Sequence, residues 1–266
     1  MAASTVSIWR SRHVLRFLVR RDLAIKYQQA FMGYLWSLIE PLAMGGIYYF
    51  VFEVMRGSKA GPEGPPFILY LLSGIFAYMW INGAMGEATG ALTGQRNLIT
   101  TMRVPREIFP IAKVIARFAE FVAVIPILVL VAVLTRAEFS LWIFSIVLAV
   151  LLQAIFLTGV ALLLAAVNVM LRDVERFMRL VQRMIFYGSP IIYSLQWVDD
   201  ALPGWAMALY TANPIVTIIE LHHAAWYPQV FPSPVMLATA TTGCLLTLLV
   251  GWLVFRRLES AVLKEL

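Results

Sequence analysis

Apolar residues recur in six long runs, each close to the ~20 residues that an α-helix needs to cross a bilayer. The runs cover roughly 33–55, 67–90, 110–134, 141–170, 180–198 and 235–255. A segment inside lipid must satisfy its own backbone hydrogen bonds, so these runs predict helices. We therefore expect an all-α integral membrane protein with six transmembrane helices.

A further apolar stretch, 203–227, is interrupted by Asn213 and Pro214 and lacks flanking positive charge. Irregular backbone at membrane depth must be buried in protein or line a cavity. The stretch therefore predicts short re-entrant helices between spans five and six, which enter from the outside and return. The alternative is a seventh span, which would place the basic C-terminal end on the outside.

The connections between the runs also carry structural signals. The polar segment 91–109 is interrupted by Pro105, which predicts a short helix ending near Arg103 and a new helix before the third span. The short connection 135–140 predicts a tight hairpin. If run 141–170 is wholly helical it rises about 45 Å, more than the ~30 Å hydrocarbon core, so it must tilt or project.

The N-terminal segment has a helical period of its own. One arc of the predicted helix is apolar and consists of Ile8, Val14, Leu15, Leu18 and Val19, and the other carries Arg10, Arg12, Arg16, Arg20 and Arg21. This pattern predicts an amphipathic interface helix in contact with membrane lipids on the cytoplasmic side; an ordinary positive-inside anchor is the alternative. We expect one transmembrane domain, 1–266, with this helix in 1–30 and a six-span bundle in 31–266.

Composition agrees with a chain built for lipid. Hydrophobic residues make up 61% of it and charged residues 14%, whereas a soluble domain carries roughly 25% charge. A soluble protein of this composition would have too little polar surface to cover its core.

The placement of the basic residues predicts the topology. Of the 21 Lys and Arg residues, all but Arg56, Lys59 and Arg136 lie at the two chain ends or around the connections after spans two and four. The positive-inside rule then places both termini in the cytoplasm of a multi-pass inner-membrane protein. Because these charges are spread over four segments and not gathered on one face, no nucleic-acid partner is expected.

The sequence carries no signature of catalysis. It lacks the G-x-x-x-x-G-K-[ST], H-E-x-x-H and G-x-S-x-G motifs of phosphate loops, zinc proteases and esterases. Its single cysteine, Cys244, and its three histidines, His13, His222 and His223, predict no metal site. We expect no catalytic residue, so any uphill transport must draw on an ion gradient or on a partner subunit.

Few ionisable residues fall inside the predicted spans, and they gather towards the cytoplasmic side. They are Glu40, Glu87, Lys113, Arg117 and Glu120. Ion-coupled carriers usually place such groups at the bilayer midplane. We expect ion pairs of Glu87 or Glu120 with Lys113 or Arg117; a role in substrate passage and a proton relay are the alternatives.

Three stretches of the chain carry a resemblance. They are RDLAIKYQQAFMGYLWSLIEPL at 21–42, NLITTMRVPREIFPIAKVIARFAEF at 97–121 and NVMLRDVERFMRLVQRMIFYGSPIIY at 168–193. Together with Asn213-Pro214 and the terminal FRRLESAVLKEL, they resemble the membrane subunits of ABC transporters that export polysaccharides such as O-antigen and teichoic acid. The combination covers nearly the whole chain in order, whereas any one stretch alone would be weak.

The resemblance implies partners and a transport function. Such subunits form a homodimer and bind two ATP-binding cassette subunits on the cytoplasmic face, so ATP and Mg belong to the partner and this chain holds no cofactor. They move a lipid-linked glycan from the inner to the outer face of the membrane. The segment containing Asn97, Leu98, Met102 and Arg103 would be the coupling helix that docks on the ATPase, and 203–227 would lie near the outer gate.

A conduit for sugars needs aromatic faces and hydrogen-bonding groups, and the chain offers both. The candidates to line the path are Tyr34, Trp36, Tyr48, Tyr49, Phe52, Phe186, Tyr187 and Tyr193. The alternative for each is a place in the aromatic belts at the bilayer interfaces.

Two proline sites predict a movable closure on the outer side. Ser189-Pro190 falls inside the fifth run, where proline removes a backbone hydrogen bond and kinks the helix. Asn213-Pro214 repeats this device in the re-entrant stretch. A fixed kink that only shapes packing is the alternative.

Two other functions stay open at this stage. The first is an ABC-type efflux permease for a drug or small amphiphile. The second is a membrane enzyme acting on lipid-linked sugars, which would need a catalytic group facing outwards. The outer side offers mainly Asp199, Asp200 and Glu220 for that purpose.

Overall fold

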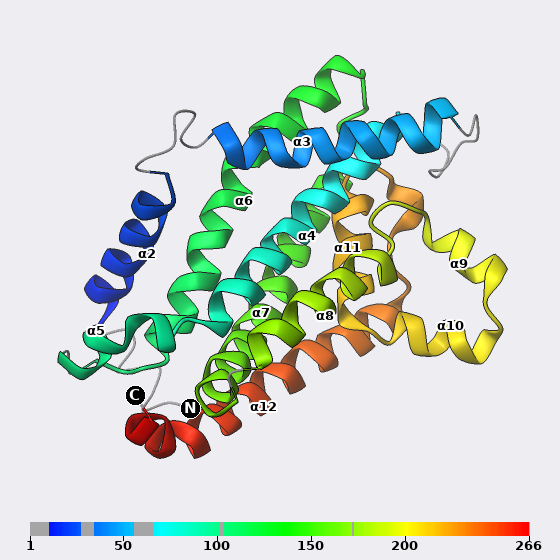
Figure 1. The fold of residues 1–266 in the computed structure, drawn as a ribbon. Coiled ribbons are helices and arrows are strands. Elements are labelled where there is room, and N and C mark those ends of the chain that lie inside the picture. The colour runs from blue at the N-terminus through cyan, green and yellow to red at the C-terminus, as the bar shows by residue number, and fades with distance from the viewer. Residues whose placement is uncertain (1–10, 28–34, 56–65, 102–103, 172, 266) are drawn as a thin grey trace.

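The computed structural model describes residues 11–27, 35–55, 66–101, 104–171 and 173–265. Three predicted site residues, Tyr34, Met102 and Arg103, lie outside the described residues. Within the described parts every regular element is a helix, as Figure 1 shows. The principal helices are α2 (Arg12–Tyr27), α3 (Trp36–Tyr49), α4 (Phe67–Thr89), α5 (Arg96–Thr101), α6 (Ile108–Leu134), α7 (Ser145–Met170), α8 (Val174–Gly188), α9 (Leu195–Ala201), α10 (Gly204–Thr211), α11 (Pro214–Ala224) and α12 (Pro234–Glu265).

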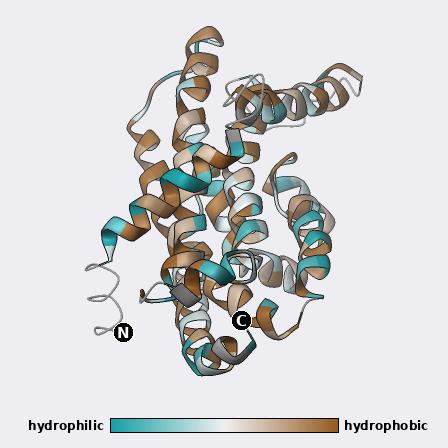
Figure 2. Ribbon diagram, turned by 60° about the vertical axis from the view of Figure 1, so that its left-hand side comes forward, coloured by the Kyte–Doolittle hydropathy of each residue, from teal (hydrophilic) through white to brown (hydrophobic). Residues whose placement is uncertain are grey.

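Four further short elements occur in the described residues. They are the π-helical turn η2 (Phe50–Met55), which continues α3, and the 3₁₀ turns η3 (Thr93–Gln95), η4 (Leu141–Phe144) and η5 (Pro228–Val230). Figure 2 shows that hydrophobic residues dominate the long helices. Five helices of the described chain are long and apolar enough to cross a membrane: Leu38–Met55, Phe67–Thr89, Ile108–Leu134, Leu141–Met170 and Pro234–Val262.

The predicted fifth span, 180–198, differs from the structure. Its helix, α8, begins earlier and ends at Gly188, so it is too short to count as a span by itself. Ser189 takes an extended conformation (φ −120°, ψ 153°) because the ring of the following Pro190 disfavours helical backbone before it. The predicted kink is therefore a helix end, and the total of six spans stays a prediction.

The helix α4 forms the centre of the bundle. Of its apolar window, 78% is buried inside the protein, against 11% for Leu38–Met55. A helix that is apolar on all sides is suited to such a central place, where it packs against α3, α6, α7, α8 and α11. The wide apolar surface of α3 and η2 is left for lipid or for another protein chain.

The helices α7 and α12 approach each other closely because glycines meet between them. A Cβ atom added at Gly251 would collide with the carbonyl of Gly159, and one at Gly159 would collide with the backbone of Leu248. Small residues at such a crossing let two membrane helices pack backbone against backbone.

The amphipathic pattern of the N-terminal segment is confirmed from Arg12 onwards. Leu18 is fully buried against α6 and its neighbours, and Val14, Leu15 and Val19 are half-buried beside it. Of the arginines that the pattern placed on the opposite arc, Arg12, Arg16 and Arg20 are exposed, whereas Arg21 is half-buried.

The predicted re-entrant stretch forms two short helices, α10 and α11, separated at Asn213. The Asn213 side chain accepts a hydrogen bond from the backbone N–H of Ile215 at 3.0 Å, and Pro214 is the first residue of α11. Proline is favoured there because the N–H that it lacks has no helical partner in any case. Asn213-Pro214 is thus an ordinary helix start, and the prediction that it repeats a kink device is wrong.

Candidate functional site

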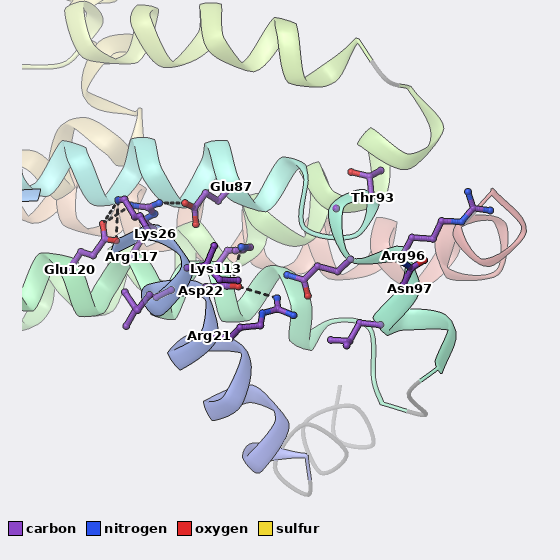
Figure 3. A pocket seen from close by; sticks show the side chains of 16 residues that line it. Arg21, Asp22, Lys26, Glu87, Thr93, Arg96, Asn97, Lys113, Arg117 and Glu120 are labelled. Atoms are coloured by element: carbon purple, nitrogen blue, oxygen red, sulfur yellow. Dashed lines mark hydrogen bonds and ion pairs between the residues drawn. The ribbon is translucent and has the colours of Figure 1, made fainter. Parts of the chain in front are cut away.

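At one end of the bundle, α2, α4, α5 and α6 enclose a cavity of about 770 Å³, which we call the charged cavity (Figure 3). Its basic lining residues are Arg21, Lys26, Arg96, Lys113 and Arg117, and its acidic ones are Asp22, Glu87 and Glu120. Five cations therefore face three anions, which leaves an excess of positive charge. Such a cavity suits an anionic ligand.

Asp22 joins α2 to the wall of this cavity. Its carboxylate contacts Lys113 Nζ at 2.8 Å and Arg21 at 3.0 Å, and its side chain is only 8% exposed. The sequence analysis missed this residue, although Asp22 is the only acidic residue in the first thirty, among six basic ones. A single acidic residue within a basic helix is the sequence signal that could have identified Asp22 as the partner of a basic residue.

Arg117 occupies the centre of a second group of charges. It contacts Glu87 on α4, the pairing expected between spans, and Glu120 one turn further along α6. Glu120 also accepts from Lys26 Nζ at 3.0 Å. Burial, followed by the charge of Arg117, lowers the pKa of Lys26, while Glu120 opposes that shift. Lys113 does not pair with a glutamate as expected, because Asp22 of α2 lies closer than either.

The charged cavity borders a smaller one of about 180 Å³. Lys26, Arg117 and Glu120 line both. The smaller cavity also includes Glu40, the remaining charged residue singled out in the spans, and the aromatic rings of Phe76 and Trp80. Charged groups and an apolar, aromatic wall are thus adjacent, an arrangement that suits an amphiphile with an anionic head.

The predicted coupling residues lie beside this site on α5. Asn97 is exposed and also lines the charged cavity. Leu98 is half-buried and packs, with the buried Ile99, against the small core beneath α2. A contact of this helix with an ATPase remains a prediction.

The aromatic candidates divide into several places. Phe186 on α8 meets Tyr48 of α3 at 5.7 Å, Tyr78 of α4 at 4.9 Å and Tyr187 at 5.0 Å between ring centroids. Phe52 is 6.5 Å from Tyr48 in the same group. Trp36 is exposed at the opposite end of α3, Tyr49 packs half-buried against the main core, and Tyr193 bonds to Tyr210.

The break after α8 is held by a buried histidine. His223 Nε2 donates to the carbonyl of Pro190 at 3.0 Å, and its Nδ1 lies 2.9 Å from Ser73 Oγ on α4. Its ring stacks on Tyr70 with 3.7 Å between centroids. The neighbouring His222 contacts Gln153 of α7 at 2.9 Å. The sequence analysis considered these histidines only as metal ligands and missed this structural role.

Within the described parts of the chain, no three His, Cys, Asp or Glu side chains come together in a way that could hold a metal ion. The charges of the site are instead arranged in pairs across helices.

Comparison with known proteins agrees with the membrane fold. The sequence profile of the ABC-2 type transporter family matches residues 13–226. The chain therefore belongs to the ABC-2 type transporter family, and it is a multi-pass membrane permease.

Individual relatives match almost end to end. The O-antigen export system permease protein RfbA of Klebsiella pneumoniae is 26% identical over 92% of both chains. RfbA of Myxococcus xanthus is 27% identical over 90% of both. The polysialic acid transport protein KpsM of Escherichia coli is 25% identical over 93% of this chain and 94% of its own.

Proposed function

We propose that this chain is the transmembrane subunit of an ATP-driven exporter that moves a lipid-linked polysaccharide from the cytoplasmic to the outer face of the inner membrane. The observation that carries the proposal is the end-to-end likeness to permeases named for O-antigen, polysialic acid and capsule polysaccharide export. These relatives differ in the glycan that their names state. Their common feature is export of a long sugar polymer.

The charged cavity supports the lipid-linked form of the substrate. A polymer attached to a lipid phosphate presents an anionic head next to an apolar tail. The excess of cations in the charged cavity matches the head, and the neighbouring cavity with Phe76 and Trp80 matches the start of the tail. The cavity also lies beside α5, so binding there is well placed to reach the ATPase.

The surface of α8 supports a homodimer. Phe177, Leu180, Met184 and Tyr187 follow one another at helical spacing and are each more than half exposed. An exposed apolar stripe on a helix is typical of a surface that packs against an apolar partner. A second copy of this chain would cover it and bring two sets of the aromatic residues around Phe186 to one central path.

The proposed energy source is a separate pair of ATP-binding subunits that hold ATP and Mg, with both termini of this chain on their cytoplasmic side. The test is to purify the chain alone and together with its cognate ATP-binding subunit. The chain alone should hydrolyse no ATP, and the complex should show vanadate-sensitive hydrolysis. Robust hydrolysis by the single chain would contradict the proposal.

A cellular experiment tests the substrate. Deleting the gene should remove the polysaccharide from the cell surface and accumulate the lipid-linked glycan on the cytoplasmic face. Restoring the gene should reverse both effects. Unchanged surface polysaccharide, together with loss of resistance to small amphiphiles, would favour a drug-efflux permease.

A further inference from the structure

A second cavity, of about 670 Å³, lies far from the charged cavity, on the side predicted to face outwards. We call it the outer cavity. Its walls come from α9, α10, α11, η5 and the start of α12. Its volume falls in the range of roughly 300–1,000 Å³ that is typical of small-molecule sites.

The outer cavity contains a buried acid without a partner. Glu220 of α11 forms part of its wall and is only 1% exposed. The Oε1 atom of Glu220 is buried and has no hydrogen-bond partner within the described part of the chain. Leaving such a group without a hydrogen bond is energetically costly. The fold therefore retains a polar atom that no group in the described part of the chain satisfies, which points to a ligand that does.

The rest of the wall defines the chemistry of that ligand. Its polar side chains are hydroxyls, amides and carboxylates: Ser194, Gln196, Asp199, Glu220, Gln229 and Ser233. There is no Lys or Arg anywhere between Met184 and Phe255, so an anionic ligand has no counter-charge. Phe231, held against Trp142 with 4.8 Å between ring centroids, and Met236 add an apolar wall.

We propose that the outer cavity binds a neutral sugar unit. Sugar hydroxyls would hydrogen-bond to the carboxyl groups of Glu220 and Asp199, and the C–H face of the ring would pack on the apolar wall. The described lining of the outer cavity has two carboxyl groups with amides and hydroxyls but no third acid or histidine, a set that suits sugar hydroxyls better than a metal ion. The inference rests on the proposed function, because it gives an exported glycan a site at the outer end of the protein.

The test uses the chain with its ATP-binding partner in lipid nanodiscs. Binding of the methyl glycosides of mannose, galactose, glucose and N-acetylglucosamine is measured by saturation-transfer NMR. At least one should bind, and Glu220→Gln, which replaces one carboxyl oxygen by an amide NH2 group, should weaken it by up to about tenfold, the value of one hydrogen bond. Asp199→Asn should also weaken it. Asp200→Asn is the matched control, because Asp200 is the exposed neighbour of Asp199 and is not part of the wall.

Thermal unfolding distinguishes a ligand site from a structural role. If the role of Glu220 is to bind a ligand, the Glu220→Gln variant without sugar should have the same melting temperature as the unaltered protein, or a higher one. A clear fall in melting temperature would show a structural role and overturn the proposal, as would failure of all four glycosides to bind the unaltered protein. Sugar binding that persists in a protein that exports no glycan would contradict the proposed function alone. Normal export without any sugar binding would contradict this inference alone.

Discussion

His223 and Pro190 are joined by a hydrogen bond of 3.0 Å in which the imidazole Nε2 donates to the proline carbonyl. This bond ties α11 to the break that follows α8. Since a carbonyl can only accept, the bond requires that Nε2 carry the proton. The side chain of His223 thus satisfies a carbonyl at the helix end that Pro190 imposes.

The first prediction concerns this bond. His223→Phe keeps a ring against Tyr70 but leaves the Pro190 carbonyl without its donor, while the Ser73 hydroxyl keeps its hydrogen bond to the Tyr70 carbonyl. We expect a loss of about 1–3 kcal/mol in stability, measured by thermal unfolding in detergent. His13→Phe, at an exposed site on α2, is the control and should change little. Equal effects of both substitutions would contradict a special role for His223.

The second prediction concerns the attachment of α2. Asp22→Asn removes the partner of Lys113 and should cost about 1.5–3 kcal/mol, because the pair is largely buried. The swap of Asp22→Lys with Lys113→Asp should recover part of the loss. Glu175→Gln breaks an exposed pair with Arg179 on α8 and should change stability by less than about 0.5 kcal/mol. No difference between Asp22→Asn and Glu175→Gln would refute the assignment.

The third prediction concerns the close crossing of α7 and α12. Gly251→Ala puts a methyl group against the Gly159 carbonyl, so the helices must separate, at a cost of about 1–3 kcal/mol or more. Gly46→Ala on α3, where a Cβ meets no atom within 4 Å, should be neutral or slightly stabilising. The yield of monodisperse protein on size-exclusion chromatography measures both. A normal yield of Gly251→Ala would show that the helices pack less tightly.

The fourth prediction concerns coupling. Leu98→Asp should weaken co-purification of the ATP-binding subunit, because it places a charge on the proposed docking face of α5. Leu98 also packs on a small core, so Leu98→Met serves as the control that retains apolar bulk. The membrane subunit must stay monodisperse for the comparison to count. Unaltered co-purification and transport with Leu98→Asp would place the contact elsewhere.

The fifth prediction concerns the proposed outer gate. Single cysteines at Tyr193 and Asn213, in a Cys244→Ala background, are treated with a membrane-impermeant thiol reagent. Asn213 is exposed and Tyr193 is half-buried, so their starting reactivities should differ. A movable closure predicts that labelling changes when the ATPase is trapped with nucleotide. Identical labelling in both states at both positions would favour a fixed break.

The sequence by itself determined the membrane class and the position of most helices. Runs 67–90, 110–134 and 141–170 correspond to α4, α6 and η4 with α7 to within two residues. The agreement arises because the lipid bilayer requires each spanning segment to be apolar over a fixed length. It also requires the segment to form its own backbone hydrogen bonds. The amphipathic N-terminal helix followed from its period for the same local reason.

Only the tertiary structure decided which groups meet. The pairing of Asp22 with Lys113 joins residues from two helices, and no spacing along the chain indicates it. The contacts of His223 with Pro190 and Ser73, and the place of Glu220 in the outer cavity, likewise bring together distant segments. Periodicity in the sequence assigns a residue to one face of its own helix. Which neighbouring helix that face contacts is decided by the packing of the whole bundle. For that reason the helices could be predicted from the sequence, whereas their polar partners, apart from the pair of Glu87 and Arg117, could not.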